Sequence, residues 1–231
     1  MFLDKRKKEK SMFNIAIDGP AGAGKSTIAK KVAKELDFIY VDTGAMYRSM
    51  ALYFIRKQVK AAEVDKIITL LPEIHVTIAY ENGEQHVYLN GEDVSTLIRN
   101  EEVSQMTSSI STIPEVREKL LSLQRNLAKE NNVLMDGRDI GTCVLPDAEL
   151  KIYLTASVGV RAKRRYNEMI EKGMECDLEE LVASIKERDY RDMNREIAPL
   201  KQAEDAVLLD TSDMNIEEVV NAIIRMVKER A

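Results

Sequence analysis

Apolar residues along the chain gather in five short runs that are almost continuously hydrophobic, at residues 14–18, 39–42, 133–136, 150–154 and 206–210. Continuous rather than alternating hydrophobicity is typical of parallel strands that are buried on both faces of a sheet. The pattern therefore predicts an α/β fold with a five-stranded parallel sheet wrapped by helices.

Between these runs, apolar residues recur at helical spacing. Helices are predicted over residues 27–36, 178–191 and 216–228, and a fourth is indicated by a stripe of Val116, Leu120, Leu123 and Leu127. The fourth helix follows Pro114, and the pair Thr112 and Glu115 has the spacing of a capping box. Alternating strands and helices predict a doubly wound sheet, in which ligands bind at the carboxyl ends of the strands.

One segment departs from this alternation. Residues 75–79 and 86–89 alternate apolar and polar side chains and flank the turn-forming stretch 81–84, Glu-Asn-Gly-Glu. This pattern predicts a β-hairpin. We expect residues of about 71–99 to form an insertion in the α/β core, and both histidines of the chain, His75 and His86, lie in it.

Composition narrows the classes of protein. The 231 residues, 45% of them hydrophobic, suit one large domain with insertions. The net charge of -5 argues against a protein that coats nucleic acid or an anionic membrane. Cys143 and Cys176 form no CxxC motif, so we expect no disulfide framework and a cytoplasmic location. No apolar run approaches the ~20 residues of a membrane span.

The first twelve residues are basic, with a cluster of charges from Lys5 to Lys10. They lack the apolar stretch of a signal peptide. We expect a disordered, solvated tail over residues 1–12 and a single domain over 13–231, with Met12 as an alternative start. Contact of the tail with RNA or lipid is the other interpretation.

A glycine-rich motif follows the first strand directly. Residues 19–26, Gly-Pro-Ala-Gly-Ala-Gly-Lys-Ser, fit the pattern G-x-x-x-x-G-K-[ST]. Glycines let backbone N–H groups approach phosphate oxygens, and the helix that follows directs its positive end to the same place. The residues expected to bind the nucleotide are Gly19, Pro20, Ala21, Gly22, Ala23, Gly24, Lys25, Ser26 and Thr27. Among them, Lys25 would reach the β- and γ-phosphates, and the Ser26 hydroxyl would ligate Mg²⁺.

Two further segments follow predicted strands, VDTGAMYR at 41–48 and MDGRDIGT at 135–142. Each carries a glycine, an arginine and hydrogen-bonding groups at a strand's carboxyl end. Arginine suits phosphate because its planar fork binds two oxygens at once. For Arg138 and Asp139, a local ion pair that holds a loop together is an equally good interpretation.

Arginines recur in the last third of the chain. Two sets have helical spacing, Arg161, Arg164 and Arg165, and Arg188, Arg191 and Arg195. For any single arginine, a solvated face with acidic neighbours is the better interpretation. As a set, they suit a lid over residues of about 158–196 that closes on triphosphate, because a positive lid stabilises the charge that develops in phosphoryl transfer.

Together, GPAGAGKST, VDTGAMYR, DGRDIGT, IKERDYRDMNREIAPL and AVLLDTS resemble the motifs of bacterial cytidylate kinases, in the same order from Met12 to the end of the chain. The resemblance implies a P-loop nucleoside monophosphate kinase fold with an enlarged, hairpin-containing monophosphate-binding region and a short arginine-rich lid. It also implies transfer of the γ-phosphoryl group of ATP to CMP or dCMP with Mg²⁺. The basic extension departs from the family core.

By position, the resemblance implies roles for the acceptor site. Arg48 and Arg138 would hold the acceptor phosphate, and Tyr47 would line the same pocket. Arg188 and Asp192 would lie around the sugar, with Asp192 accepting from its hydroxyls.

For the base, the resemblance implies that the Thr43 hydroxyl lies at or near the cytosine ring, with Ser108 on the base edge. Arg117 would lie near the cytosine carbonyl, and Asp139 would accept from the amino group. Uracil would oppose a carbonyl to this carboxylate, and a buried polar mismatch costs about 1–3 kcal/mol. CMP should therefore be preferred over UMP.

Arg161 and Arg195 would belong to the lid over ATP. The residues expected to act in catalysis are Lys25, Arg138, Arg188, Asp192 and Arg195. A phosphate acceptor is already ionised at neutral pH, so positioning and charge stabilisation should suffice without a general base.

Two other functions remain open from the residues. A P-loop kinase of a small metabolite alcohol, of the shikimate or gluconate type, would use Asp42 or Asp136 as its base. A nucleotide-binding switch is less favoured, because there is no guanine-reading N-K-x-D motif. We expect ATP and CMP or dCMP as the partners of a monomer, and a packing role for Cys143.

Overall fold

The computed structural model describes residues 12–81 and 83–230. Apart from Met12, the expected basic extension lies outside the described residues, and so does Asn82 in the expected hairpin turn.

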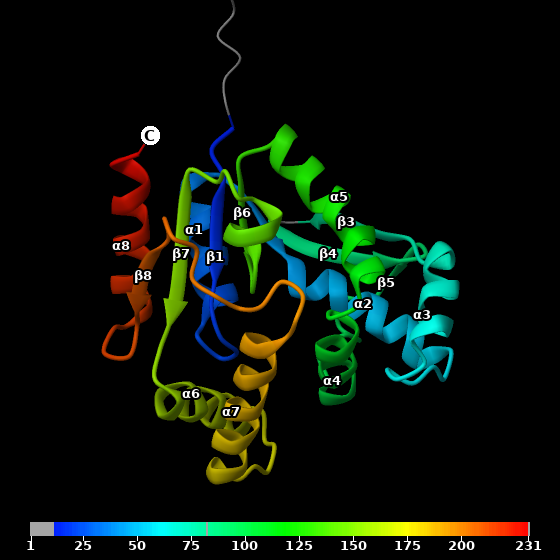
Figure 1. The fold of residues 1–231 in the computed structure, drawn as a ribbon. Helices are drawn as coiled ribbons and strands as arrows, with labels where there is room; N and C mark the ends of the chain where they lie inside the picture. The colour runs from blue at the N-terminus through cyan, green and yellow to red at the C-terminus, as the bar shows by residue number, and fades with distance from the viewer. Residues whose placement is uncertain (1–11, 82, 231) are drawn as a thin grey trace, which may run out of the picture.

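The main sheet has five parallel strands in the order β2-β6-β1-β7-β8 (Figure 1). Their bounds are β1 Ile15–Asp18, β2 Ile39–Asp42, β6 Val133–Gly137, β7 Leu150–Thr155 and β8 Val207–Asp210. Each observed strand matches a predicted run to within one residue at either end, so the prediction of a five-stranded parallel sheet is confirmed. The central strand, β1, pairs with β6 on one side and β7 on the other.

Helices cover both faces of this sheet. They are α1 (Lys25–Leu36) and α8 (Ile216–Lys228) on one face, and α2 (Thr43–Arg56) and α5 (Pro114–Glu130) on the other. Successive side chains of a strand point to opposite faces. Ile15 and Ile17 accordingly pack in the core under α1 and α8, whereas Ala16 packs in the core under α2 and α5. Strands buried on both faces explain the continuous apolar runs.

The helix α5 begins without the predicted capping box. Its N-cap residue is Ile113, which makes no side-chain cap, and Pro114 occupies the first turn. The Thr112 hydroxyl instead donates to the carbonyl oxygen of Ser109 at 2.7 Å. Proline needs no N–H partner at this position, so the helix starts one residue later than the pair with Glu115 requires.

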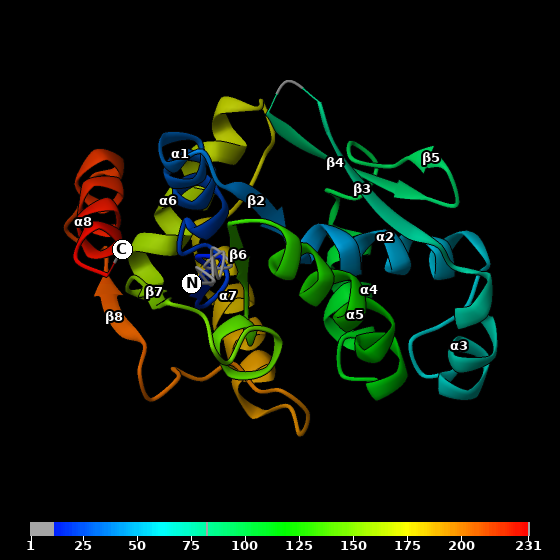
Figure 2. The same ribbon diagram turned by 90° about the horizontal axis from the view of Figure 1, so that it is seen from above.

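A second, three-stranded antiparallel sheet has the order β3-β4-β5, with β3 Val76–Glu81, β4 Glu84–Leu89 and β5 Glu92–Asp93. The predicted hairpin is therefore present. It lies beyond the β2 edge of the main sheet, on the side away from α8 (Figure 2). The short helix α3 (Val64–Leu70) and a single 3₁₀ turn (Leu71–Glu73) lead into it.

Three further helices lie at the carboxyl ends of the strands, as Figure 1 shows for α6 and α7. They are α4 (Glu101–Ile110), α6 (Val158–Glu171) and α7 (Leu178–Asn194). The pair α6 and α7 occupies the segment expected to form a lid, and one wide turn, Ile140–Val144, follows β6. Within the described ranges, none of the helices has the length and hydrophobicity needed to cross a membrane.

Candidate active site

The glycine-rich loop connects β1 to α1. A Cβ atom at Gly19, whose φ is 154°, would collide with the carbonyl oxygen of Leu154 on the neighbouring strand. Gly24 has a φ of 86° and stands directly before the first helical residue, Lys25. The loop therefore needs glycine at both ends, and it brings the N-terminus of α1 to the carboxyl edge of the sheet.

The lysine of the loop is buried against the loop backbone. Its Nζ donates to the carbonyl oxygens of Gly19 at 2.8 Å and Pro20 at 2.9 Å. Burial, followed by repulsion from Arg138, lowers the pKa of Lys25 to about 7. A nearby anion such as phosphate would restore the charge of this ammonium, because an opposite charge favours the ionised form.

The hydroxyl of Ser26 faces a carboxylate at the end of β6. It donates to Asp136 Oδ2 at 2.9 Å, and the Tyr40 hydroxyl donates to Asp136 Oδ1 at 2.9 Å. Burial raises the pKa of Asp136, and repulsion from Asp42 adds to the effect. A hydroxyl and a carboxylate are the oxygen ligands that Mg²⁺ prefers. Among the described residues, no three acidic, histidine or cysteine side chains cluster as a metal site.

A large cavity of about 750 Å³ opens beside the loop. Gly22, Gly24 and Thr27 line it on one side, and the segment from Thr211 to Val219 lines the other. Arg164 borders this cavity, where it donates to the hydroxyl and carbonyl oxygens of Thr211.

A second cavity, of about 90 Å³, lies between the carboxyl ends of β2 and β6 and the helices α4 and α7. It brings together ten of the residues selected from the sequence, Thr43, Tyr47, Arg48, Ser108, Arg117, Arg138, Asp139, Arg188, Asp192 and Arg195. These residues come from five separate parts of the chain. We call this the acceptor cavity.

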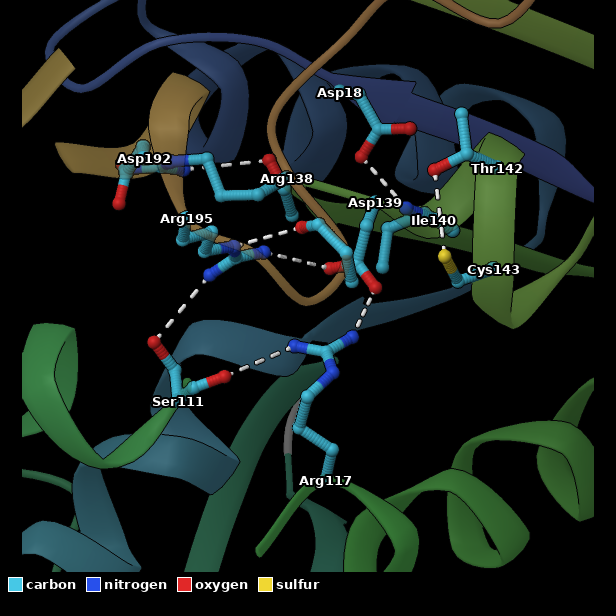
Figure 3. A network of polar contacts seen from close by, with 12 residues as sticks. Asp18, Ser111, Arg117, Arg138, Asp139, Ile140, Thr142, Cys143, Asp192 and Arg195 are labelled. Carbon is cyan, nitrogen blue, oxygen red and sulfur yellow. Dashed lines mark hydrogen bonds and ion pairs between the residues drawn. The ribbon is translucent and has the colours of Figure 1, made fainter. Parts of the chain in front are cut away.

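At one end of the acceptor cavity, the Asp139 carboxylate lies between two guanidinium groups (Figure 3). Arg117 donates to its Oδ2 atom, and Arg195 Nη2 donates to its Oδ1 atom at 3.4 Å. Arg117 also lies over the ring of Tyr47, and burial raises the pKa of that phenol to about 12. One carboxylate thus serves two arginines, and this end keeps a positive charge.

The other end of the acceptor cavity has guanidinium N–H groups without partners in the part of the chain that the structure describes. Arg138 Nε donates to Asp192 Oδ2 at 2.8 Å. Within the described part of the chain, the Nε atoms of Arg48 and Arg188 are buried and have no hydrogen-bond partner. Burial, and then repulsion from Arg138, lowers the pKa of Arg188 to about 10. Buried N–H groups without partners are costly, so this end is prepared for an anion with several oxygens.

The helix α2 presents Thr43, Tyr47 and Arg48 because Asp42 caps it. The Asp42 carboxylate accepts from the backbone N–H of Ala45 at 2.8 Å and from Arg48 Nη2 at 3.0 Å. Thr43 anchors the helix to β6 by donating from its hydroxyl to the Asp136 carbonyl at 2.7 Å.

Comparison with known proteins identifies a family. A family model described as cytidylate kinase matches residues 15–229. A cytidylate kinase of Caldicellulosiruptor saccharolyticus is 53% identical over 213 residues, which cover 92% of this chain and 94% of the relative. A cytidylate kinase of Streptococcus pneumoniae is also 53% identical, over 90% of this chain and 94% of the relative.

The chain belongs to the cytidylate kinase family. Among solved structures, an uncharacterized protein from Eubacterium ventriosum aligns with a TM-score of 0.54 over 95% of this chain and 100% of that chain. Its sequence identity is 12%, so this likeness supports the fold alone.

Two arginines that the resemblance assigns to the lid over ATP make other contacts in this structure. Arg195 was expected over ATP, but it lines the acceptor cavity, because α7 ends there and the Arg195 side chain turns back to Asp139. Arg161 lies beneath the loop and is 4% exposed. Its guanidinium donates to the carbonyl oxygens of Ala156 and Ala21 at 2.8 Å each and pairs with Asp189, so it supports the loop from below.

The remaining arginines do not share one face of a lid. Arg191 lies outside the acceptor cavity and pairs with Glu187 on its own helix at 3.8 Å. Arg165 points to α4, where its Nη2 atom is 3.4 Å from Glu101. The helical spacing was correct, but packing of α6 against α7 directs neighbouring arginines to different partners.

Three residues in or beside the cavities escaped the sequence analysis. The Ser111 hydroxyl accepts from Arg195 at 3.4 Å, and the Ser111 carbonyl accepts from Arg117. Asp18 accepts from two backbone N–H groups of the DGRDIGT segment. Thr107 lines the acceptor cavity next to Ser108. No motif signals Ser111 or Thr107, whereas Asp18 could have been noticed as a charge at the end of an apolar strand.

Proposed function

We propose that this chain transfers the γ-phosphoryl group of ATP to CMP or dCMP, giving ADP and the matching nucleoside diphosphate. The observation that carries the proposal is the acceptor cavity beside the glycine-rich loop. One of its ends offers unpaired guanidinium N–H groups for a phosphate, and the other offers a carboxylate between two arginines for a base. Family membership agrees with this chemistry.

At the phosphate end, Arg48, Arg138 and Arg188 would hold the acceptor. Their mutual repulsion is relieved when an anion binds, which favours a dianionic phosphate over a neutral hydroxyl compound. The attacking oxygen is already ionised, so the residues need only orient it and stabilise the charge that spreads over the transferred group. Asp192 keeps Arg138 in place and would accept from the sugar hydroxyls.

At the base end, the Asp139 carboxylate would accept from the cytosine amino group, and Arg117 would donate to the carbonyl edge. Asp139 and Arg117 already point into this end of the cavity. A uracil carbonyl would face the carboxylate with lone pair against lone pair. The site should therefore select CMP over UMP.

The donor nucleotide would occupy the larger cavity, with its phosphates on the loop. Lys25 would bind the phosphates, and Ser26, with Asp136 beside it, would hold Mg²⁺. When bound, Mg²⁺ neutralises charge on the phosphate oxygens. The helices α6 and α7 would act as the lid and exclude water, which prevents hydrolysis of ATP.

A kinase of a metabolite alcohol is less well supported. That reaction requires a free carboxylate to accept the hydroxyl proton, and the two candidates are both engaged. Asp42 binds Arg48 and Arg99, and although burial alone would raise the pKa of Asp42, these arginines lower it. Asp136 is held by Tyr40 and Ser26. A non-catalytic switch would not need the guanidinium groups of the acceptor cavity.

A coupled assay of ADP release tests the proposal. The protein is given ATP and Mg²⁺ with CMP, dCMP, UMP, AMP or shikimate in parallel. Fast turnover with CMP and dCMP and much slower turnover with UMP is expected. Turnover with shikimate, or with none of these acceptors, would refute the assignment of the acceptor cavity and leave only the nucleotide loop. Sedimentation of the same sample tests the expected monomer.

A further inference from the structure

The carboxylate of Asp18 is buried at a place where the reaction gives it no obvious task. It stands at the end of β1, immediately before Gly19 of the nucleotide loop, and is 5% exposed. Burying an ionisable group is costly unless hydrogen bonds compensate. The partners of this carboxylate therefore indicate what it does.

Those partners belong to the acceptor side of the site. Asp18 Oδ1 accepts from the backbone N–H of Ile140 at 2.8 Å, and Oδ2 accepts from the N–H of Gly141 at 2.7 Å (Figure 3 shows the bond to Ile140). The N–H groups of Gly141 and Ile140 each lower the pKa of Asp18 more than the attraction to Lys25 of the nucleotide loop does. Although Asp18 adjoins the loop in sequence, it is bonded to the DGRDIGT segment.

These two bonds bear on the two substrate-facing side chains of that segment. On the N-terminal side, strand pairing fixes the segment as far as Gly137. This residue lies opposite Asp18 in the parallel pairing of β1 and β6. On the C-terminal side, the Asp18 carboxylate holds it from Ile140 onward. Only Arg138 and Asp139 lie between the two anchors, so their backbone directions are set by both.

The turn that follows is closed from its other end by a cation. Arg125 on α5 donates to the carbonyl oxygens of Cys143 at 2.8 Å and Val144 at 3.1 Å. An acceptor at the start of the turn and donors at its end match the direction of the peptide dipoles. Of Asp18 and Arg125, only Asp18 holds the end of the turn that adjoins Arg138 and Asp139.

We propose that Asp18 is a positioning residue for the acceptor nucleotide, which sets the orientation of Asp139 and Arg138 through the N–H groups of Ile140 and Gly141. The inference rests on the proposed function. A carboxylate is required because its two oxygens accept from two parallel N–H donors, whereas an amide has one acceptor and would oppose its NH₂ group to the second donor. The residue before the nucleotide loop thus serves the selection of cytosine.

The decisive variants are Asp18→Asn and Asp18→Glu. The asparagine keeps the size but loses one acceptor, and the glutamate keeps the charge near Lys25 but displaces both oxygens. Losing a buried hydrogen bond of a charged group should raise the KM for CMP roughly ten- to a hundredfold in either variant. The preference for CMP over UMP should fall, and the KM for ATP should stay within about threefold, since the loop keeps its own contacts.

Hydrogen exchange gives a readout that does not depend on activity. The amide hydrogens of Ile140 and Gly141 should exchange faster in both variants, whereas those of the nucleotide loop should not change. The matched control is Asp93→Asn, because Asp93 also accepts from a backbone N–H, that of Ser95 at 2.9 Å, but lies on the three-stranded sheet. This control should behave as wild type.

Several outcomes would overturn the proposal. One is an equal rise in the KM for ATP and CMP, and another is an unchanged KM for CMP with unchanged selectivity. If only Asp18→Asn has an effect, loss of charge near Lys25 explains it and positioning does not. Unchanged exchange at Ile140 also refutes it. If wild type fails to phosphorylate CMP, the proposed function fails instead, and the exchange arm still decides whether Asp18 anchors the segment. If Asp18→Asn does not fold, Asp18→Glu alone tests the positioning, because it keeps the charge near Lys25; if Asp18→Glu does not fold, hydrogen exchange at Ile140 and Gly141 in Asp18→Asn decides.

Discussion

Replacing Asp139 by asparagine probes base selection with almost no change of shape. The Asp139 carboxylate is 7% exposed and uses Oδ2 for Arg117 and Oδ1 for Arg195. An amide keeps one of these acceptors and opposes its NH₂ group to the other arginine. The same NH₂ group can donate to the O4 carbonyl of uracil, which the carboxylate repels.

The expected magnitude follows from these contacts. Losing one hydrogen bond to a charged group costs about 1.5–3 kcal/mol, which lowers kcat/KM for CMP roughly ten- to a hundredfold. For UMP, the same hydrogen bond is lost, but the repulsion between the carboxylate and the uracil carbonyl, about 1–3 kcal/mol, disappears and offsets that loss. The ratio of kcat/KM for CMP over UMP should therefore collapse to within about threefold.

The assay measures initial rates of ADP release with each acceptor at saturating ATP and Mg²⁺. Asp205→Asn is the control, because Asp205 is also an ion-paired carboxylate, 2.7 Å from Lys151, but it is exposed and lies outside the acceptor cavity. A thermal melt shows whether Asp139→Asn is folded at the assay temperature. If the CMP preference survives in a folded variant, the assignment of Asp139 to the cytosine amino group is wrong.

The other predictions concern charge at the same site. Lys25→Met should lower kcat about a hundredfold or more. It should also raise the melting temperature, because burial lowers the pKa of Lys25 to about 7 and so disfavours the charged side chain in the folded protein. A variant with near-normal kcat, or with a lower melting temperature, contradicts this prediction. Arg195→Met should raise the KM for CMP tenfold or more and leave that for ATP within about twofold; the opposite pattern would return Arg195 to the donor side. Burial raises the pKa of Asp18 from its ordinary 3.8 to about 6; the hydrogen bonds from Gly141 and Ile140 lower it, and the smaller effects are repulsion from Asp139 and attraction to Lys25. The protonated Asp18 therefore stabilises the fold below about pH 4, and this stabilisation is lost as pH rises through 6. In urea unfolding, the free energy of unfolding of wild type minus that of Asp18→Asn should fall by up to about 3 kcal/mol between pH 4 and 7. If this difference does not change with pH, the prediction is wrong.

Much of the fold could be predicted because its signals lie in consecutive residues. The observed β2 and α8 have the predicted bounds, and the other main strands differ by one residue at most. The glycine loop could also be recognised, since strand, loop, lysine and helix follow one another directly. The start of α5 could not, because the choice between Thr112 and Ile113 as cap depends on how the chain leaves α4.

The sequence by itself determined most of the candidates for the chemistry. Lys25, Ser26, the arginines and Asp139 were all selected from local motifs and from the resemblance to a family. It could not determine the side of the site on which a long side chain ends, since that depends on how a helix is rotated against distant elements.

Tertiary structure alone decided that Arg195 joins Asp139, whereas Arg161 supports the loop from beneath. It also decided that Asp18 holds the DGRDIGT segment, 122 residues away along the chain. The physical reason is the same in each case. A buried charged group goes where its hydrogen bonds are satisfied, and those partners come from strands and helices that only folding brings together.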